Sequence, residues 1–519
     1  MLNSAMQFIN KHERFGLMEK IDVIRDINFG RRTAEEESDE LMRYFVETEN
    51  WRKVWEDEVD LIFAPKGGGK SAIYQMLLNR EDSLADDRKI HLLPADKPQG
   101  NSVFQLLKDD NDLNEEKFER IWTLYFLALA VSKLEDLNIK DSKLKGLRKA
   151  LDSAGLSSAE KKSQNIMQRI REAFDRVVNG GEIVGPTFID PATSTPISVG
   201  SIKFGVPTSA EASNGLIDIQ ELYEDLEEVL KDRDINVWIL LDRLDVAFST
   251  SPELERIALR ALFRTYSNLK ASKRLSFKIF LRTDIWKSVA AGGFRELSHM
   301  ERELKIGWDR ATMRALLVRR LLLSKKLQEM VELDAEDTLE SGDQQEKLLQ
   351  KIYPDQVEPG DRKRPTTLDW VLSRIEDGNE VAVPRELIHM YSEARDSELR
   401  RIENGQSNLP GDKLFESQAF KEDAWPEVSR TRLSMTIYAE YADVTEWLDL
   451  LKEQKTEQDA KSLSQIWGIT EAEAAKRRDR LIDIGFFKDK KATVWVPFLY
   501  RPALKMIQGA PDDVNARKK

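Results

Sequence analysis

The sequence predicts an α/β protein built on a parallel sheet with helices on both faces. Three observations lead to this prediction. Short apolar runs alternate along the chain with longer segments of helical periodicity. The first of these runs leads into a turn with three consecutive glycines, and two later runs end in charged residues. Strands that alternate with helices form parallel sheets, and such sheets bind their ligands at the carboxyl ends of the strands.

The elements of this sheet can be placed in order. Strands are expected at Leu61–Ala64, Ile90–Leu93, Val237–Leu241, Lys278–Leu281 and Glu303–Ile306. The helices between them are expected at Ser71–Asn79, Glu115–Leu137, Pro252–Leu269 and Trp286–Phe294. The long distance from the first strand to the third predicts an insertion over about 133–231. It starts as charged helical sequence and continues as a Gly-, Pro-, Ser- and Thr-rich stretch that predicts a mobile loop, with one hairpin arm at Ser201–Val206.

The rest of the chain is predicted to be mostly helical. Helices are expected from Trp308 to Ile402, with a polar break at Asp355–Pro365 and a linker at Asn404–Lys413. Ser434–Leu504 has the order of a winged helix: a short helix, a second helix at Thr470–Phe487, and a β-wing. The predicted domains are an N-terminal helical segment with the adenine-side residues (1–58), the core (59–307), a helical lid (308–403), a linker (404–433), a winged helix (434–508) and a tail (509–519).

The most specific motif is LIFAPKGGGKSAI, at Leu61 to Ile73. It follows the phosphate-loop pattern G-x-x-x-x-G-K-[ST], with Ala64 at the first glycine position. Backbone N–H groups of such a loop approach phosphate oxygens closely, and the helix that follows adds its positive end. Lys70 can reach the β- and γ-phosphates of ATP, and the Ser71 hydroxyl can bind Mg²⁺. The predicted nucleotide-binding residues of the loop are Lys66, Gly67, Gly68, Gly69, Lys70, Ser71 and Ala72. The alternative is a Gly-rich turn that merely precedes a helix.

A second motif, VWILLDRLDVAF, ends an apolar strand in Asp242. A carboxylate at this place can hold Mg²⁺ together with Ser71. Many ATPases of this layout place an acid at the next position to orient the attacking water, but here that residue is Arg243. Asp245 is the nearest replacement, and hydrolysis that depends on it would be slow or need a partner. The alternative is an ordinary buried strand that ends in a surface aspartate.

Two further arginines are candidates for sensing the phosphates. Arg282, or Thr283 beside it, ends the strand of FKIFLRTDIW and could contact the γ-phosphate; the alternative is a helix start capped by Thr283 or Asp284. Arg385 follows Pro384 where a lid helix would begin, and a guanidinium suits phosphate. The alternative for Arg385 is a solvated helix N-terminus.

Upstream of the phosphate loop, INFGRRTAEEE could line an adenine pocket with Phe29 and Gly30. The alternative is a helix start followed by an acidic, solvated turn. Either way, the segment lies within the predicted N-terminal helical domain.

Composition excludes several kinds of chemistry. The chain has no cysteine and four scattered histidines, which excludes disulfides, thiolate zinc sites and cysteine nucleophiles and leaves Mg²⁺ as the expected metal. The N-terminus lacks the apolar core of a signal peptide, and no apolar run approaches the roughly 20 residues of a membrane span. We therefore expect a cytoplasmic protein without membrane contact.

The net charge of −12 gives no general attraction to nucleic acid, so a DNA contact would need a local patch. The predicted winged helix has such a patch, diluted by acidic residues, and either DNA or a protein could bind there. Its members are Lys476, Arg477, Arg478, Arg480, Lys488, Lys490 and Lys491.

Taken together, these motifs resemble the STAND/KAP and initiator-like branch of the AAA-type P-loop ATPases. The matching pieces are FGRRTAEEE, APKGGGKSAI, ILLDRLD, FLRTD, ELKIGW and VPRELI, in family order, from Phe29 to about Ala394. The resemblance implies a soluble ATPase of the kind found in bacterial antiphage systems. Two departures stand out: Arg243 replaces the second acid, and the inserted membrane helices of many KAP relatives are absent.

The resulting hypothesis is an ATP-binding and ATP-hydrolysing switch that forms a homo-oligomer and controls a separate effector protein. A neighbouring copy would supply an arginine finger, for which Arg295 and Arg302 are the candidates by position. Two alternatives stay open. One is a DNA loader or motor that binds DNA through the winged helix, and the other is a nucleotide-bound scaffold that does not hydrolyse.

Overall fold

In the computed structural model the chain divides into two compact units, which are described separately. The sheet unit contains Glu49–Pro65 and Lys70–Ile306. The helical unit contains Met1–Thr48, Lys66–Gly69 and Gly307–Lys519. The structure describes residues 11–31, 38–95, 114–154, 156, 182–184, 188–189, 196–197, 201–204, 216–244, 252–291, 293–294, 296, 300–361, 363–411 and 413–510.

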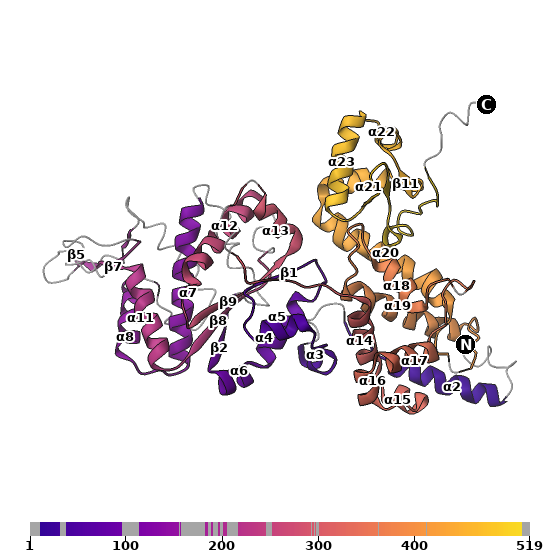
Figure 1. The fold of residues 1–519 in the computed structure, drawn as a ribbon, viewed down its shortest axis with the longest axis horizontal. Coiled ribbons are helices and arrows are strands. Elements are labelled where there is room, and N and C mark those ends of the chain that lie inside the picture. The colour runs from indigo at the N-terminus through magenta and orange to yellow at the C-terminus, as the bar shows by residue number, and fades with distance from the viewer. Residues whose placement is uncertain are drawn as a thin grey trace. The chain divides into compact units, whose positions relative to one another are not determined.

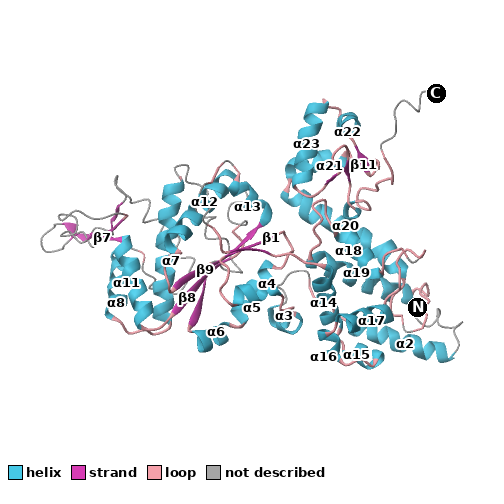
Figure 2. Ribbon diagram, viewed as in Figure 1, coloured by secondary structure: helices cyan, strands magenta, loops and turns pink. Residues whose placement is uncertain are grey.

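The sheet unit is built on five parallel strands in the order β10-β1-β9-β8-β2 (Figures 1 and 2). The strand that follows β8 in the chain, β9, lies between β1 and β8, so the fold is that of a P-loop NTPase with an inserted strand. All five predicted strands are confirmed, with ends that differ by up to three residues. The strands are β1 (Leu61–Ala64), β2 (Ile90–Pro94), β8 (Asn236–Leu241), β9 (Leu275–Arg282) and β10 (Glu303–Lys305).

Helices cover both faces of this sheet because the strands are apolar on both sides. On one face, Phe277 of β9 packs edge-on against Phe126 of α7. On the other face, Phe280 of β9 packs edge-on against Tyr74 of α5. The helices of the sheet unit are α4 (Glu49–Trp55), α5 (Lys70–Asn79), α6 (Glu81–Arg88), α7 (Glu115–Asp136), α8 (Ser142–Ser153), α11 (Ile219–Asp232), α12 (Pro252–Leu269) and α13 (Thr283–Ala290).

Two sequence predictions for the sheet unit need correction. Helix α13 begins three residues earlier and ends four residues earlier than predicted, since the chain turns into it directly from Arg282. The predicted loop of the insertion contains short strands where the structure describes it, and the strand predicted at Ser201 pairs with β3 and β7. These strands are β3 (Glu182–Val184), β4 (Phe188–Ile189), β5 (Pro196–Ile197), β6 (Ser201–Lys203) and β7 (Leu216–Asp218).

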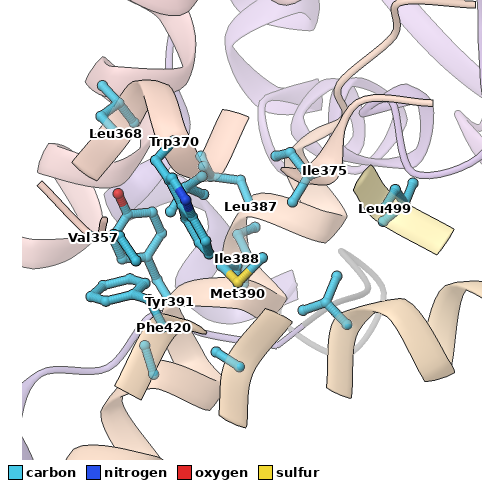
Figure 3. Close-up of a cluster of buried hydrophobic side chains, with 14 of the residues drawn as sticks. Val357, Leu368, Trp370, Ile375, Leu387, Ile388, Met390, Tyr391, Phe420 and Leu499 are labelled. Atoms are coloured by element: carbon cyan, nitrogen blue, oxygen red, sulfur yellow. The ribbon is translucent and has the colours of Figure 1, made fainter. Parts of the chain in front are cut away.

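The helical unit contains most of the remaining elements. Its N-terminal and lid helices are α2 (Lys11–Asp26), α3 (Ser38–Tyr44), α14 (Arg310–Leu321), α15 (Lys325–Val331), α16 (Ala335–Glu340), α17 (Gly342–Ile352), α18 (Thr367–Ile375) and α19 (Pro384–Glu403). Figure 3 shows part of the core of this unit, in which Trp370 of α18 and Tyr391 of α19 lie among aliphatic side chains and Phe420 of η5. The polar break predicted at 355–365 separates α17 from α18, as expected.

The linker predicted over 404–433 ends earlier than expected. The chain is helical from Ala419, because Phe420, Ala424 and Val428 recur every fourth residue and bury one face. The first turns are π-helical and precede Pro426, which cannot donate a backbone hydrogen bond. The elements are η5 (Ala419–Ala424), α20 (Trp425–Arg432), η6 (Leu433–Tyr438), η7 (Ala442–Val444) and α21 (Thr445–Asp449).

The region predicted as a winged helix has the expected order of elements. Two helices, α22 (Ala460–Trp467) and α23 (Glu471–Asp483), are accompanied by a three-stranded antiparallel sheet in the order β11-β13-β12. Helix α23 ends four residues before the predicted end because Gly485 adopts a left-handed conformation at φ +75°. The other elements are β11 (Glu457–Gln458), β12 (Lys488–Asp489), β13 (Val494–Trp495) and η8 (Phe498–Tyr500).

Among the described residues, no helix combines the length and apolar character needed to cross a bilayer.

A fully buried lysine ties three strands of the sheet together. Lys278 of β9 donates hydrogen bonds to the Asp57 carboxylate at 2.5 Å and to the Val59 carbonyl at 2.6 Å, both just before β1. Its ammonium also lies 4.4 Å from the centre of the Trp238 ring of β8. Burial lowers the pKa of Lys278, and the nearby carboxylates oppose that shift. This side chain therefore fixes β9 against both of its neighbours.

We predict that Lys278→Ala destabilises the sheet unit by about 2–5 kcal/mol, because it removes a fully buried side chain and its hydrogen bonds and leaves a cavity. Urea unfolding measures the loss, and hydrogen exchange of β1 and β9 peptides assigns it to this unit. Lys273→Ala, at an exposed position just before β9, is the matched control and should change stability by no more than about 0.5 kcal/mol. Equal stability of the two variants would contradict the anchoring role.

Candidate nucleotide-binding site

Ser71 and Asp242 meet at the carboxyl edge of the sheet. Ser71 lies in the first turn of α5, directly after the phosphate loop, and Asp242 follows the last residue of β8. The Ser71 hydroxyl donates a hydrogen bond to Oδ2 of Asp242 at 3.1 Å, although the two residues are 171 positions apart. Asp242 is buried. The structure thus brings together the two residues predicted to hold Mg²⁺.

This pair fits the ion that the motif implies. A hydroxyl and a carboxylate are hard oxygen donors, and Mg²⁺ is usually held by one or two carboxylates together with waters and substrate phosphates. The described residues include no cluster of three or more His, Cys, Asp or Glu side chains arranged for a metal. Ser71 and Asp242 would therefore hold the ion, and bound ATP would supply further oxygens.

Lys70 is the first residue of α5, and its ammonium lies within the loop. It donates hydrogen bonds to the carbonyl oxygens of Ala64 at 3.0 Å and Pro65 at 3.3 Å. The first turn of α5 contains no acidic side chain. The backbone N–H groups of this turn and the Lys70 charge thus face no carboxylate from their own helix turn, which suits an anionic ligand.

The middle of the loop, Lys66–Gly69, belongs to the helical unit. Gly67 and Gly69 have φ of +82° and +99°, a conformation that residues with a Cβ rarely adopt. A Cβ added to Gly67 would lie 2.9 Å from Cβ of Arg385, so the loop and α19 are in close contact. The Trp308 indole donates a hydrogen bond to the Gly68 carbonyl at 2.9 Å.

Lys66 is held by η6 and by the residues that follow it. Its ammonium forms an ion pair with Glu440, and it lies 3.5 Å from the Met435 carbonyl oxygen. Sequence reasoning missed both Trp308 and Glu440 as loop contacts. Trp308 stands in the piece ELKIGW that carried part of the family resemblance, whereas nothing in the sequence pointed to Glu440.

Arg385 is the second residue of α19, after Val383 as N-cap and Pro384 at the first position. This confirms the predicted helix start. The contact with Gly67 places Arg385 at the phosphate loop within the helical unit, as its predicted role in phosphate sensing requires.

Arg282 ends β9 and is the register partner of Ala64, the last residue of β1. It therefore lies at the same edge of the sheet as the phosphate loop. Its guanidinium binds the Asp284 carboxylate at 2.6 and 3.1 Å. Arg282 itself is the N-cap of α13, with Thr283 as the first helical residue, so neither Thr283 nor Asp284 is the cap.

The position after Asp242 is unusual. Arg243 has φ +56°, a left-handed conformation that costs a non-glycine residue about 1–2 kcal/mol. The chain thus turns sharply between Asp242 and the buried Leu244. Asp245, the predicted base, lies outside the described residues, as does Arg295.

The remaining predicted site residues, Phe29, Gly30 and Arg302, all contact other parts of the chain. The Phe29 ring is buried in the helical core beside Tyr391, and the Gly30 N–H donates to the Asn28 side chain at 2.8 Å. The adenine contact of Phe29 and Gly30 stays a prediction. Arg302 binds Asp60 at 3.0 Å at the amino end of β1, the end opposite the phosphate loop.

In the predicted winged helix, most cations of the basic patch are paired with carboxylates. Arg478 binds Asp479 at 2.7 Å, Arg480 binds Asp443 at 3.2 Å, and Lys488 forms an ion pair with Glu380. Lys476 lies 3.5 Å from Glu473, and Arg477 stacks on Trp447. The patch is thus largely neutralised by its own chain.

The chain is similar to solved structures of two Aeropyrum pernix proteins and one Pyrobaculum aerophilum protein. The match with the Aeropyrum pernix ORC2 protein, solved as ADPNP-ADP complexes, covers 87% of this chain and 88% of that protein. The sequence identity is 10% and the TM-score is 0.39. The match with the Aeropyrum pernix ORC1 protein in complex with DNA covers 91% of this chain and 93% of that protein, at 13% identity and a TM-score of 0.33. The match with Cdc6p from Pyrobaculum aerophilum covers 58% of this chain and 72% of that protein, at 14% identity and a TM-score of 0.19.

No protein-family model matches the chain, and no curated protein sequence does. Because all three TM-scores lie below 0.5, the assignment of the fold rests on the strand order and the phosphate loop described above.

We predict that Gly67→Ala weakens Mg·ATP binding at least about tenfold, because the new methyl group strains the left-handed turn and collides with Arg385. Isothermal titration calorimetry measures the affinity. Gly146→Ala in α8, where the added methyl group meets open space, is the matched control and should bind like the parent. Parent-like binding by Gly67→Ala would show that the loop does not need this conformation.

Proposed function

We propose that this protein binds Mg·ATP and hydrolyses it, and that it works as an AAA-type switch. The observation that carries the proposal is the Ser71–Asp242 pair, held at 3.1 Å at the sheet edge where the glycine loop passes into α5. Phosphoryl transfer needs little covalent chemistry from the protein, so the task of this site is positioning and charge stabilisation.

Each residue has a definite task in this proposal. Backbone N–H groups of Lys66–Gly69 and Ala72 bind phosphate oxygens, and Lys70 exchanges its two carbonyl partners for the β- and γ-phosphates. Ser71 and Asp242 hold Mg²⁺. Asp245 orients the attacking water, since Arg243 cannot act as a base. Arg282 and Arg385 contact the γ-phosphate.

The packing of the loop supports a switch. Within the helical unit, Lys66–Gly69 touches Arg385, Trp308 and Glu440. A phosphate that binds Lys66 competes with the Glu440 carboxylate for the same ammonium. ATP binding would then release a contact of the C-terminal region, and the released region could bind another copy of the chain or a separate effector. A role in antiviral defence rests on the family resemblance alone.

A scaffold that holds ATP without hydrolysis is the second candidate, and the specific observation in its favour is Arg243. Its left-handed backbone fixes a cation where related layouts have an acid. Turnover measurements separate the two candidates.

We predict that Lys70→Ala binds Mg·ATP about 10- to 100-fold more weakly than the parent, since a charge-assisted hydrogen bond contributes about 1.5–3 kcal/mol. Calorimetry gives the affinity, and circular dichroism checks the fold. Lys287→Ala, exposed on α13, is the matched control and should bind normally. If Lys70→Ala binds ATP like the parent, the phosphate-loop assignment is wrong.

We also predict that Asp245→Asn keeps Mg·ATP binding but lowers turnover, by roughly 10²–10⁴-fold if it removes a general base. Asp242→Asn should instead weaken binding only when Mg²⁺ is present. Phosphate release and calorimetry give the two quantities, and light scattering of the same samples tests whether ATP changes the mass. A parent without measurable turnover would favour the scaffold.

A further inference from the structure

A cavity of about 790 Å³ lies within the C-terminal half of the helical unit. Its walls come from the segment before α18, from α18 itself, from η5 and α20, and from the residues around and after η8. The volume falls in the range of about 300–1,000 Å³ typical of small-molecule sites. None of the residues assigned to ATP line it.

The lining residues are strongly unbalanced in charge. Glu358 is the only carboxylate among them, and it lies 3.2 Å from Lys421, 3.4 Å from Arg374 and 3.9 Å from Arg364. Arg501 and Lys505 are further lining cations. One negative charge thus faces five positive charges.

Two of these arginines form a buried floor. Arg374 is 8% exposed and Arg501 is 6% exposed. The Arg374 guanidinium binds Ser373 at 2.8 Å and Glu358 at 3.4 Å, but its Nε has no hydrogen-bond partner. Arg501 binds the Val496 carbonyl at 2.9 Å, and its Nη2 has no hydrogen-bond partner. A buried donor without a partner costs about 1–3 kcal/mol.

Aromatic rings hold the two guanidinium groups in place. Both groups lie 4.1 Å from the centre of the Phe498 ring. Arg374 also lies 4.5 Å from the centre of the Trp370 ring, and Arg501 lies 4.2 Å from that of Trp495. Burial lowers the pKa of both guanidinium groups to about 10, so they stay charged at neutral pH. The floor therefore consists of two charged guanidinium groups, each of which has one nitrogen without a hydrogen-bond partner.

We propose that this cavity binds a small phosphate-bearing molecule, whose phosphate contacts Arg374 and Arg501 after entering past Lys421 and Lys505. The planar donors of arginine match phosphate oxygens, and the exposed lysines at the mouth attract the charge. A nucleic-acid backbone would meet only the exposed cations, because the floor is more than nine-tenths buried. A compact phosphate reaches the floor, so the small molecule is the better match.

The test uses the full chain with Lys70→Ala, because this substitution reduces pyrophosphate binding at the phosphate loop. Inorganic pyrophosphate is the probe, and calorimetry at low salt is the measurement. We expect saturable binding of one pyrophosphate per chain. Adding Lys421→Glu and Lys505→Glu at the mouth should weaken it at least about tenfold, since two repelling charges replace two attracting ones. Adding Lys325→Glu and Lys347→Glu, two exposed lysines on other helices, makes the same charge change and should leave binding intact.

Arg374→Gln provides a second test at the floor, with circular dichroism to check the fold and tryptophan emission as an independent signal of occupancy. Pyrophosphate should change the emission of the folded Lys70→Ala protein and not that of the folded variant that also has Arg374→Gln. No binding, or equal weakening by the mouth and control pairs, would overturn the proposal. Binding of a 20-base-pair DNA duplex that depends on the mouth lysines, without pyrophosphate binding, would also overturn it and assign the surface to nucleic acid.

Discussion

The sheet depends on keeping the charge of Lys278 satisfied where water cannot reach it. A buried ammonium is costly unless it is paired and hydrogen-bonded, and Asp57 and the Val59 carbonyl meet that need from the segment just before β1. Trp238 of β8 covers the same group. The lysine therefore fixes β9 between β1 and β8, level with the amino end of β1. That register allows Ser71, after β1, and Asp242, after β8, to meet at the opposite edge.

The phosphate loop contains residues of both units. The chain leaves the sheet unit after Pro65 and returns to it at Lys70, and the four residues between pack within the helical unit. The three contacts there differ in kind. Gly67 packs closely against Arg385, Gly68 accepts a hydrogen bond from the Trp308 indole, and Lys66 forms an ion pair with Glu440. Any ligand that reshapes the loop must act on these contacts, which is why we connect ATP binding with the C-terminal region.

The features that sequence predicts well are those written into consecutive residues. All five strands, the phosphate loop, the carboxylate after β8 and the start of α19 at Pro384 follow from local patterns and turn chemistry. The contact of Glu440 with Lys66 could not be predicted, because the residues lie 374 positions apart and no spacing rule relates them. The helix from Ala419 to Arg432 was missed for a local reason: Pro426 and the charged residues concealed its fourfold apolar spacing. Arg243 signalled a departure, but only the structure shows its left-handed backbone.

In a chain with a net charge of −12, the number of cations at a surface says little about anion binding. What matters is whether the chain already neutralises those cations. The basic residues of the predicted winged helix stand close together in the sequence, yet most meet a carboxylate. The arginines of the cavity stand far apart in the sequence, and the fold brings them together around one glutamate with donors unused. A phosphate gains more from the second arrangement, because five cations there share a single carboxylate.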